Sequence, residues 1–324
     1  MKKTIYFHIG TVKTGTTFIQ KFCHENADFL AENNLAYPHI TPPQLHLPRY
    51  ANAAFLWDPT SFEPAKEHLN QLKQSRILIS EEGLMGSPSQ INLPVFDDFE
   101  KKVILYLRPA ADVITAWATE KCKPYNAAIE VIDDQQGLFS FEKGLLRMMH
   151  DYIICMDKVV SVLSNLNDDD VFVRPFERSQ YKGGSVLHDF VEIFDVKLPF
   201  YESAAFNKSP SRKYCDISHM VWRILRDLGA PDFYNYSVVE RVYRECRSGD
   251  DRPALETLPD ATMEKLCLRL QYFETHFSSR YLNGRPLFKE RFPKAYGLKR
   301  DAYSPPDLYE VERLTRIAIN GELG

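Results

Sequence analysis

The amino-acid sequence predicts an α/β fold with a doubly wound parallel sheet, helices on both faces of the sheet and a helical C-terminal addition. Two observations predict this class. Short runs of three to five apolar residues alternate with longer segments in which apolar residues recur at helical spacing. Such runs are typical of strands buried on both faces, as in parallel sheets covered by helices. A glycine-bounded loop also joins the first apolar run to the first helical segment, which indicates a strand, a turn and a helix.

Four strands are predicted from the apolar runs, over residues 5–9, 77–79, 103–107 and 171–173. The helical periodicity predicts helices over about 16–30, 64–72, 112–122 and 141–166. In sheets of this class, ligands bind beyond the carboxyl ends of the strands. We therefore expect one edge of the sheet to gather the polar residues that follow the strands, namely 10–17, 80–82, Arg108 and 174–178.

The C-terminal part, from about Asp216, is mostly helical by pattern. Apolar residues share one helix face at 221, 224, 225 and 228, and another at 266, 270 and 273. The predicted strands run from Ile5 to Val173, across any boundary near the middle of the chain. We expect a single domain over 1–324, with the sheet core and its loop in 1–200 and a mainly helical extension of the same domain in 201–324.

Composition excludes several classes of partner. The 324 residues include 40 Lys and Arg against 44 Asp and Glu, a formal charge of −4, so no global positive field attracts nucleic acid. The six cysteines show neither CxxC pairs nor zinc-ligand spacing, which indicates reduced thiols and no metal site. The first apolar run is too short for a signal peptide, and no later run reaches membrane-spanning length. We expect a cytoplasmic protein with no membrane span that holds any anion locally.

The loop from Gly10 to Thr17 matches both glycines of the phosphate-binding pattern GxxxxGK[ST], which predicts a sheet of the P-loop type. In enzymes of nucleoside triphosphates, the lysine and hydroxyl after the second glycine serve the terminal phosphates and a magnesium ion. This chain has Thr16 at that lysine position, and its lysine is Lys13, inside the loop. The loop offers backbone amides, three hydroxyls and one ammonium, which indicates a shorter anion bound without a metal ion.

The run His8–Thr17 resembles the loop of the sulfotransferases that use 3′-phosphoadenosine 5′-phosphosulfate (PAPS), particularly the bacterial type with His-Ile-Gly-x-Pro-Lys-Thr-Gly-Thr-Thr. Only Val12 departs from that motif, at a position where proline is usual. The resemblance implies PAPS as co-substrate, with no metal required, and a contact between Lys13 and the oxygen that bridges sulfur and phosphorus. The residues that it implies for binding the 5′-phosphosulfate are Lys13, Thr14, Gly15, Thr16 and Thr17.

A second segment, 103–117, is similar to the strand and helix with which this family binds the 3′-phosphate, and Arg108 takes the place of the phosphate-binding arginine. The family's second ligand is a serine, where this chain has Ala116. Thr115 is adjacent, but it points about 100° away on a helix. The substitution indicates weaker binding of the 3′-phosphate, or compensation by residues 211–213. Looser similarities to the family lie at 79–84, 173–178 and 206–209.

Sulfuryl transfer is an in-line displacement that needs a base for the acceptor's proton and positive charge for the departing phosphate. Lys13 and the amides at the helix start would supply that charge. Glu81 and Glu82 follow a predicted strand, in which successive residues face opposite ways. The family motif favours Glu82 as the base, with Glu81 as an alternative. His46 is a rival, because related sulfotransferases also use histidine.

The resemblance implies a sulfotransferase that moves a sulfuryl group from PAPS to a hydroxyl or amine of a glycan, a lipid-linked saccharide or a small metabolite. A P-loop kinase or NTPase is a second hypothesis, against which stand Thr16 in place of lysine and the lack of a convincing strand-end aspartate for magnesium. A third hypothesis is a catalytically inactive PAPS-fold binding protein, which Ala116 favours. Residues 37–58 and the C-terminal helices are expected to shape the acceptor pocket.

Overall fold

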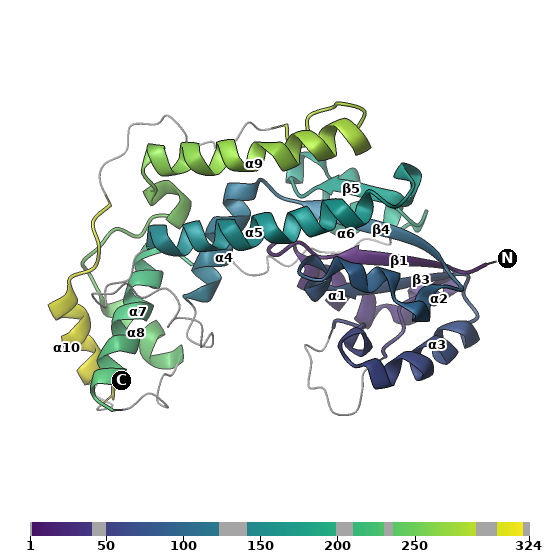
Figure 1. Ribbon diagram of the computed structural model, residues 1–324. Coiled ribbons are helices and arrows are strands. Elements are labelled where there is room, and N and C mark those ends of the chain that lie inside the picture. The colour runs from purple at the N-terminus through teal and green to yellow at the C-terminus, as the bar shows by residue number, and fades with distance from the viewer. Residues whose placement is uncertain are drawn as a thin grey trace. The chain divides into compact units, whose positions relative to one another are not determined.

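The computed structural model describes residues 2–40, 50–122, 141–198, 210–229, 236–289 and 303–319. Within these residues, five strands form one sheet in which every neighbouring pair is parallel (Figure 1). The strands span Thr4–Ile9 (β1), Leu35–Ala36 (β2), Arg76–Glu81 (β3), Glu100–Leu107 (β4) and Val171–Pro175 (β5). Their order is β2-β3-β1-β4-β5, which confirms the predicted α/β class.

Helices, short 3-10 turns and irregular segments connect the strands. The helices span Thr16–Glu25 (α1), Ala27–Glu32 (α2), Phe62–Gln71 (α3), Ala110–Lys121 (α4), Phe141–Leu163 (α5), Val186–Glu192 (α6), Arg212–Asp227 (α7), Tyr236–Glu245 (α8), Asp260–Tyr281 (α9) and Leu308–Ile319 (α10).

The strand order makes the sheet doubly wound. From β1 the chain passes to β2 and β3 on one side, and then crosses to β4 and β5 on the other side. In such sheets the ligand crevice lies where the direction of winding changes, beyond the carboxyl ends of the strands. That place here is the end of β1 and β4, so the loop after Ile9 and the residues after Leu107 occupy it.

Apolar side chains cover both faces of the sheet. On one face, Tyr6 and Tyr106 belong to a buried cluster with side chains of α1, α2 and α6. On the other face, the ring of Phe7 lies edge-on to Phe96, with centroids 4.9 Å apart, and α3 packs against the turn that holds Phe96. Because both faces are covered, each strand is an apolar run rather than an alternation of apolar and polar residues.

Two local features differ from the prediction. The helix expected over 16–30 is two helices, because Asn26 leaves the helical conformation at φ −119° and ψ 29°. The backbone N–H of Asn26 makes a helical hydrogen bond to the carbonyl oxygen of Phe22 at 3.0 Å, and its side-chain amide donates to the same oxygen at 2.8 Å and caps the end of α1. The edge strand β2 was not predicted, because it has two residues and shows no periodicity.

Contacts within the chain divide it into two compact units. The first unit comprises Met1–Ala110, Tyr152–Phe206 and Leu270–Arg291, and it contains the sheet. The second unit comprises Ala111–Asp151, Asn207–Arg269 and Phe292–Gly324, and its described residues are largely helical. The expectation of a single domain over 1–324 stays a prediction.

The second unit has an apolar core of its own. Val221 of α7 packs with Val242 of α8 and Leu314 of α10. The predicted apolar face of α7 is confirmed at Val221 and Leu225, which are both buried. Leu228 is exposed, since α7 ends before it.

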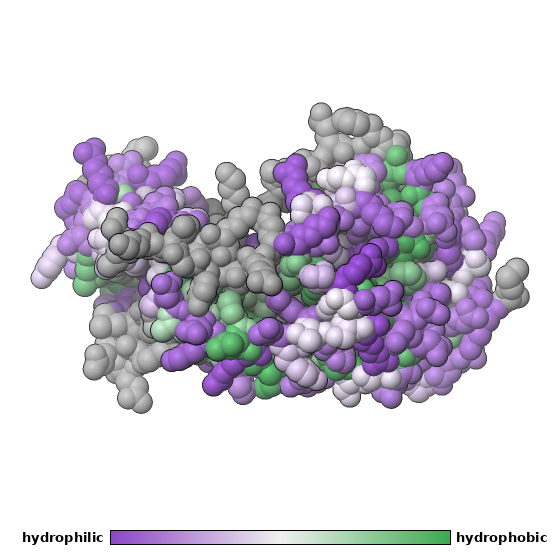
Figure 2. All heavy atoms as spheres, turned by 90° about the horizontal axis from the view of Figure 1, so that it is seen from above, coloured by the Kyte–Doolittle hydropathy of each residue, from purple (hydrophilic) through white to green (hydrophobic). Residues whose placement is uncertain are grey.

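Hydrophilic residues cover most of the face that Figure 2 shows, and the hydrophobic areas on it are smaller. The largest exposed apolar side chains include Leu268 and Tyr272 of α9 and Tyr309 of α10. Scattered exposed apolar residues are normal on folded proteins. Among the described residues, no helix is both long enough and apolar enough to cross a membrane.

Candidate functional site

In the loop after β1, residues with a left-handed backbone conformation alternate with a residue that has a negative φ. Lys13 has φ 66° and Gly15 has φ 72°, whereas Thr14 between them has no positive φ. Alternation of this kind turns successive N–H groups toward one concave surface, which is how backbone nests bind anions. A non-glycine residue in the left-handed region costs about 1 kcal/mol, so other contacts must hold Lys13 in place.

Two threonine hydroxyls hold the loop in this conformation. Thr11 Oγ1 donates to the carbonyl oxygen of Tyr106 at 2.6 Å, and Thr14 Oγ1 donates to the carbonyl oxygen of Thr11 at 2.7 Å. Both threonines are fully buried. The Thr14 hydroxyl therefore serves the loop itself, and its expected part in anion binding falls to its backbone amide.

The start of α1 leaves polar groups for a ligand. Gly15 is the N-cap residue, no side chain caps the helix and its first turn has no acidic residue. Thr16 is 1% exposed, and its Oγ1 has no hydrogen-bond partner in the part of the chain that the structure describes. A buried hydroxyl without a partner costs roughly 1–3 kcal/mol, and an anion at the helix start would accept its proton. Thr17 is exposed.

Both glycines of the phosphate-binding pattern have a packing reason. A Cβ at residue 10 would lie 2.5 Å from Oγ1 and 2.7 Å from Cγ2 of Thr16. A Cβ at residue 15 would lie 3.1 Å from the ring of Phe176, and the positive φ there favours glycine as well. Gly10 therefore makes room for the Thr16 hydroxyl, and Gly15 gives the loop its final turn.

The structure brings Arg108 to the loop that holds Lys13. Nη1 of Arg108 donates to the carbonyl oxygen of Lys13 at 3.3 Å, and both side chains are half-buried. A guanidinium and the lysine-bearing loop thus meet at the ends of β1 and β4, where the sheet changes its direction of winding. The anion-binding roles expected for these two residues stay predictions.

The segment after β5, expected at this edge from the sequence as residues 174–178, forms one wall of the site through the side chain of Phe176, a residue for which the sequence predicted no role. The N–H of Phe176 donates to the carbonyl oxygen of Leu107 at 2.5 Å, and its ring lies against Gly15. Tyr181 packs on Phe176, with ring centroids 5.7 Å apart. Burial raises the pKa of Tyr181, while the Arg108 guanidinium acts in the opposite direction. An aromatic residue directly after a strand end was the available signal.

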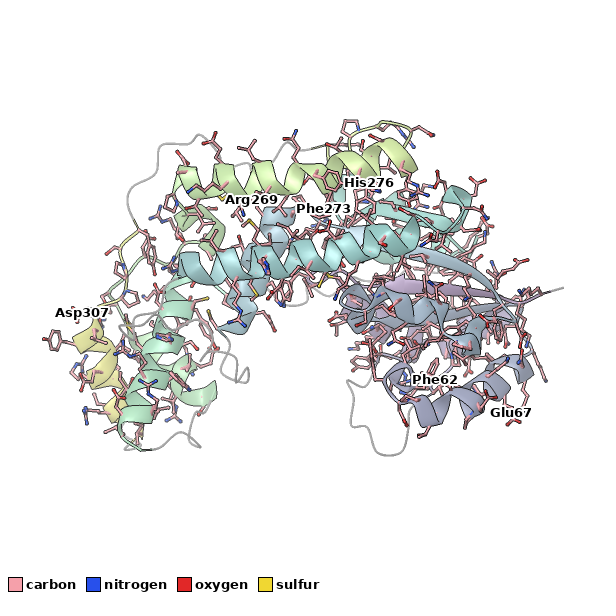
Figure 3. All side chains as sticks on the ribbon, viewed as in Figure 1. Phe62, Glu67, Arg269, Phe273, His276 and Asp307 are labelled. Atoms are coloured by element: carbon pink, nitrogen blue, oxygen red, sulfur yellow. The ribbon has the colours of Figure 1, made fainter. Side chains whose placement is uncertain are left out.

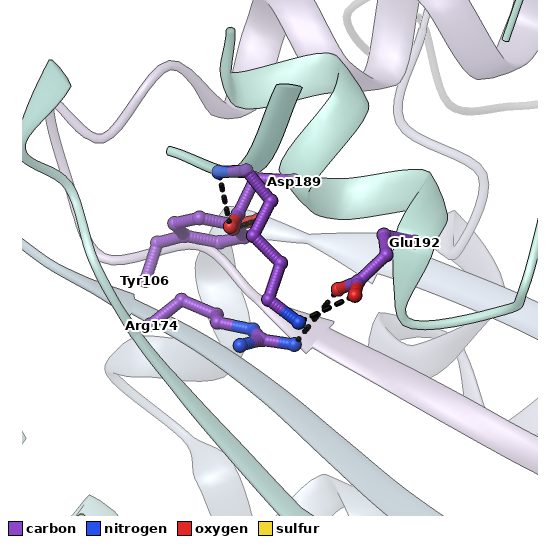
Figure 4. A network of polar contacts seen from close by, with 5 residues as sticks. Tyr106, Arg174, Asp189 and Glu192 are labelled. Carbon is purple, nitrogen blue, oxygen red and sulfur yellow. Dashed lines mark hydrogen bonds and ion pairs between the residues drawn. The ribbon is translucent and has the colours of Figure 1, made fainter. Parts of the chain in front are cut away.

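Arg174, expected at the ligand edge, instead joins a network between the sheet and α6 (Figure 4). Its Nη2 lies 3.4 Å from Oε2 of Glu192, which also pairs with the side chain of Lys182. The Tyr106 hydroxyl donates to the buried Asp189 carboxylate at 2.6 Å, and the Lys182 N–H donates to the other oxygen of that carboxylate at 3.2 Å. Arg174 therefore has a structural partner.

The two glutamates after β3 lie in different environments. The strand ends at Glu81, and Glu82 begins a 3-10 turn, so the alternation of strand residues does not extend to Glu82. Glu81 is half-buried and accepts the Gly83 N–H at 3.1 Å. Burial raises the pKa of Glu81, and the N–H groups of Gly83 and Glu82 partly oppose this. Glu82 is exposed. Glu81 has the environment of a proton acceptor, because a raised pKa strengthens a carboxylate as a base.

A buried polar network fixes the strand end that carries these glutamates. Ser80 Oγ lies 2.8 Å from Nδ1 of His8, and the Ser80 N–H donates to Oδ1 of Asn52 at 2.8 Å. Nε2 of Gln20, from α1, donates to the Ser80 carbonyl oxygen at 3.3 Å. Burial lowers the pKa of His8 to about 3, so this imidazole is neutral at ordinary pH. The network ties β3 to β1 and α1 directly beneath Glu81.

The other positions named by the sequence analysis lie outside the described residues or in the second unit. His46 lies outside the described residues. Thr115 and Ala116 are both buried in α4, and Oγ1 of Thr115 has no hydrogen-bond partner within the described ranges.

The segment expected to compensate for Ala116 has partners within the second unit. Nε of Arg212 donates to Oδ1 of Asp216 at 3.0 Å. The buried Nζ of Lys213 donates to the carbonyl oxygen of Cys246 at 2.8 Å. Both cations are therefore engaged in structural contacts.

Comparison with known proteins gives matches among solved structures alone. No family model and no curated protein matches the chain. The chain is similar to the sulfotransferase domain from the curacin biosynthetic pathway, at 10% identity and a TM-score of 0.38 over 61% of this chain and 76% of that one. It is also similar to a sulfotransferase from Alicyclobacillus acidocaldarius, at 13% identity and a TM-score of 0.37 over 76% of this chain and 100% of that one. The fold assignment rests on the strand order and the parallel pairing of the sheet.

Proposed function

We propose that this protein is a sulfotransferase that moves a sulfuryl group from PAPS to a hydroxyl or amine of an acceptor. The observation that carries the proposal is the loop in which Lys13 and Gly15 have left-handed backbone conformations, followed by the buried Thr16 hydroxyl, which has no hydrogen-bond partner among the described residues. Amides, one hydroxyl and one ammonium suit a single anionic group at the start of a helix. The position of Arg108 beside the loop supports a role for its guanidinium in binding a second anionic group.

In the proposed reaction, the acceptor atom attacks sulfur, the bond between sulfur and the bridging oxygen breaks, and the acceptor's proton passes to a base. Lys13 would stabilise the negative charge that develops on the bridging oxygen. The amides of Thr16 and Thr17 and the Thr16 hydroxyl would bind phosphate oxygens at the positive end of α1. The protein's part is therefore mostly positioning and electrostatic stabilisation.

We propose a glutamate at the end of β3 as the base. The family resemblance favours Glu82, and the raised pKa of Glu81 supports that residue as the alternative. His46 stays the rival from the sequence. The two glutamates differ in burial. Substitution of each by glutamine in turn shows which one is the base, because only that variant is expected to lose activity.

A P-loop kinase or NTPase is less well supported. Thr16 replaces the lysine that serves the terminal phosphates in those enzymes, and its side chain packs against Gly10 rather than extending from the loop. The inactive binding protein is favoured by one observation, the replacement of the family serine by Ala116. Such a protein would bind adenosine 3′,5′-bisphosphate and transfer nothing.

Incubation with PAPS labelled in its sulfur tests the proposal. Acceptors should be pooled by class as saccharides, lipid-linked saccharides and small hydroxylated or amino compounds. We expect labelled product and release of adenosine 3′,5′-bisphosphate in at least one pool. Binding of the bisphosphate without transfer to any pool would favour the inactive binding protein instead.

A further inference from the structure

A small apolar pocket lies beyond the carboxyl end of β4, within the unit that contains the sheet. Its lining includes Leu107, Arg108, Ala110, Tyr152, Phe273 and Glu274. Tyr152 of α5 and Phe273 of α9 meet edge to face, with ring centroids 6.4 Å apart, and Figure 3 labels Phe273. Arg108 and Glu274 are the only ionised groups among the pocket's described lining residues.

Glu274 places its carboxylate at the start of α4. The N–H of Ala110, the first residue of that helix, favours the ionised form of this carboxylate. Burial raises the pKa of Glu274, and the Glu274 carboxylate in turn contributes, after burial, to the raised pKa of Tyr152. The lining of the pocket and the electrostatic effects thus agree that the Glu274 carboxylate lies near the start of α4.

The position of the Glu274 carboxylate bears on the 3′-phosphate, which is the second anionic group of the proposed donor. The first N–H groups of a helix are unsatisfied by the helix itself and attract negative charge. Here Glu274 already supplies a negative charge at Ala110, two residues after Arg108. A phosphate bound by Arg108 would therefore be repelled by a half-buried carboxylate that lines the same pocket.

We propose that Glu274 is a specificity-determining residue that weakens the contribution of the donor's 3′-phosphate to binding. The protein therefore discriminates only weakly between adenosine 5′-phosphosulfates with and without a 3′-phosphate. This inference rests on the proposed function and on the role proposed there for Arg108. Because Glu274 lies in the pocket beside Arg108 and not among the residues of the loop, we expect it to act on donor choice rather than on the chemical step.

Calorimetric titration with adenosine 3′,5′-bisphosphate and with adenosine 5′-monophosphate tests the proposal. In the wild type, we expect the bisphosphate to bind no more than about tenfold more tightly than the monophosphate. Glu274→Gln should tighten the bisphosphate about tenfold and leave the monophosphate unchanged. Glu264→Gln is the matched control, because Glu264 lies exposed on the same helix and should change neither affinity.

The ratio of the two nucleotide affinities in the wild type tests the inference even if the Glu274 variant does not fold. A preference of more than about a hundredfold for the bisphosphate would overturn it, as would a Glu274→Gln ratio equal to that of the wild type. Failure of the proposed function looks different: neither nucleotide would bind, whatever residue stands at 274.

Discussion

Lys13 sits in a left-handed backbone conformation that costs about 1 kcal/mol, in the loop that the two glycines enclose. The Thr11 and Thr14 hydroxyls and Arg108 hold that loop. Strained residues that the surrounding structure fixes in this way are frequent at functional sites. The strain therefore agrees with a role for the Lys13 ammonium.

Removal of that ammonium tests its role. We expect Lys13→Ala to lower kcat of sulfuryl transfer by about 10²- to 10³-fold, the loss typical of one electrostatic group at a developing anion. Thermal unfolding should be nearly unchanged. Lys21→Ala is the control, because Lys21 forms an exposed ion pair with Glu25 on α1 and should leave the rate unaltered. A Lys13→Ala rate equal to that of the wild type would show that the assigned role is wrong.

The base is identified by pH dependence. A carboxylate accepts a proton only when ionised, so kcat/KM should fall as the pH is lowered through the pKa of the base. If Glu81 is the base, the fall occurs at higher pH than for an ordinary glutamate, because burial raises the pKa of Glu81. Glu81→Gln would then remove activity and Glu82→Gln would not. The opposite pattern identifies Glu82, and retained activity in both variants leaves His46.

Glu81 also predicts a pH effect on stability. Its pKa is raised in the folded state, so the fold binds this proton more tightly than the unfolded chain does. The stability that comes from this proton is present at low pH and is lost as the pH rises through the folded pKa. We expect Glu81→Gln to raise the free energy of unfolding at neutral pH, measured in urea. A lower free energy of unfolding at neutral pH would mean that the carboxylate is stabilised by contacts other than those described.

At the scale of elements, the site depends on how β1, α1 and β4 meet. Gly10 faces Thr16, so a methyl group at residue 10 collides with the start of α1. We expect Gly10→Ala to destabilise the protein by about 1–3 kcal/mol, as overpacking does. Adding Thr16→Ala to the same chain should recover part of this loss in urea unfolding. Equal stability of Gly10→Ala and the wild type would contradict this close contact.

The contact between the sheet and α6 makes a separate prediction. The Tyr106 hydroxyl donates to the buried Asp189 carboxylate, which keeps one other donor, the Lys182 N–H. Tyr106→Phe should lower the free energy of unfolding by roughly 1–3 kcal/mol, since a buried acceptor loses a partner. Tyr309→Phe, at an exposed position on α10, is the control and should change little. Equal effects of the two substitutions on the free energy of unfolding would show that the hydrogen bond to Asp189 does not contribute to stability.

Sequence patterns predicted the elements that depend on residues close together in the sequence. The apolar runs around Phe7 and Leu105 gave their strands, because both faces of the sheet are covered. The break at Asn26 was missed, because apolar periodicity continues across it while a side-chain hydrogen bond ends α1. The segment 174–178 was expected at the ligand edge, but the packing of Phe176 on Gly15 and the place of Glu274 were missed, because both depend on contacts between segments distant in the sequence.

Because the whole molecule has a formal charge of −4, the proposed binding of an anion would depend on local geometry. The doubly wound order brings the loop after β1 and the residue after β4 to one edge, and this follows from topology that no single motif contains. Nucleic-acid binding would instead need an extended positive surface. The proposed function therefore depends on residues at one edge of the sheet, at the ends of β1 and β4.

Calorimetric titration with adenosine 3′,5′-bisphosphate and, separately, with ATP and magnesium is the most direct test of the proposed function. We expect the bisphosphate to bind more tightly than ATP with magnesium, and Lys13→Ala to weaken binding of the bisphosphate. Tight binding of ATP with magnesium and no affinity for the bisphosphate would contradict it.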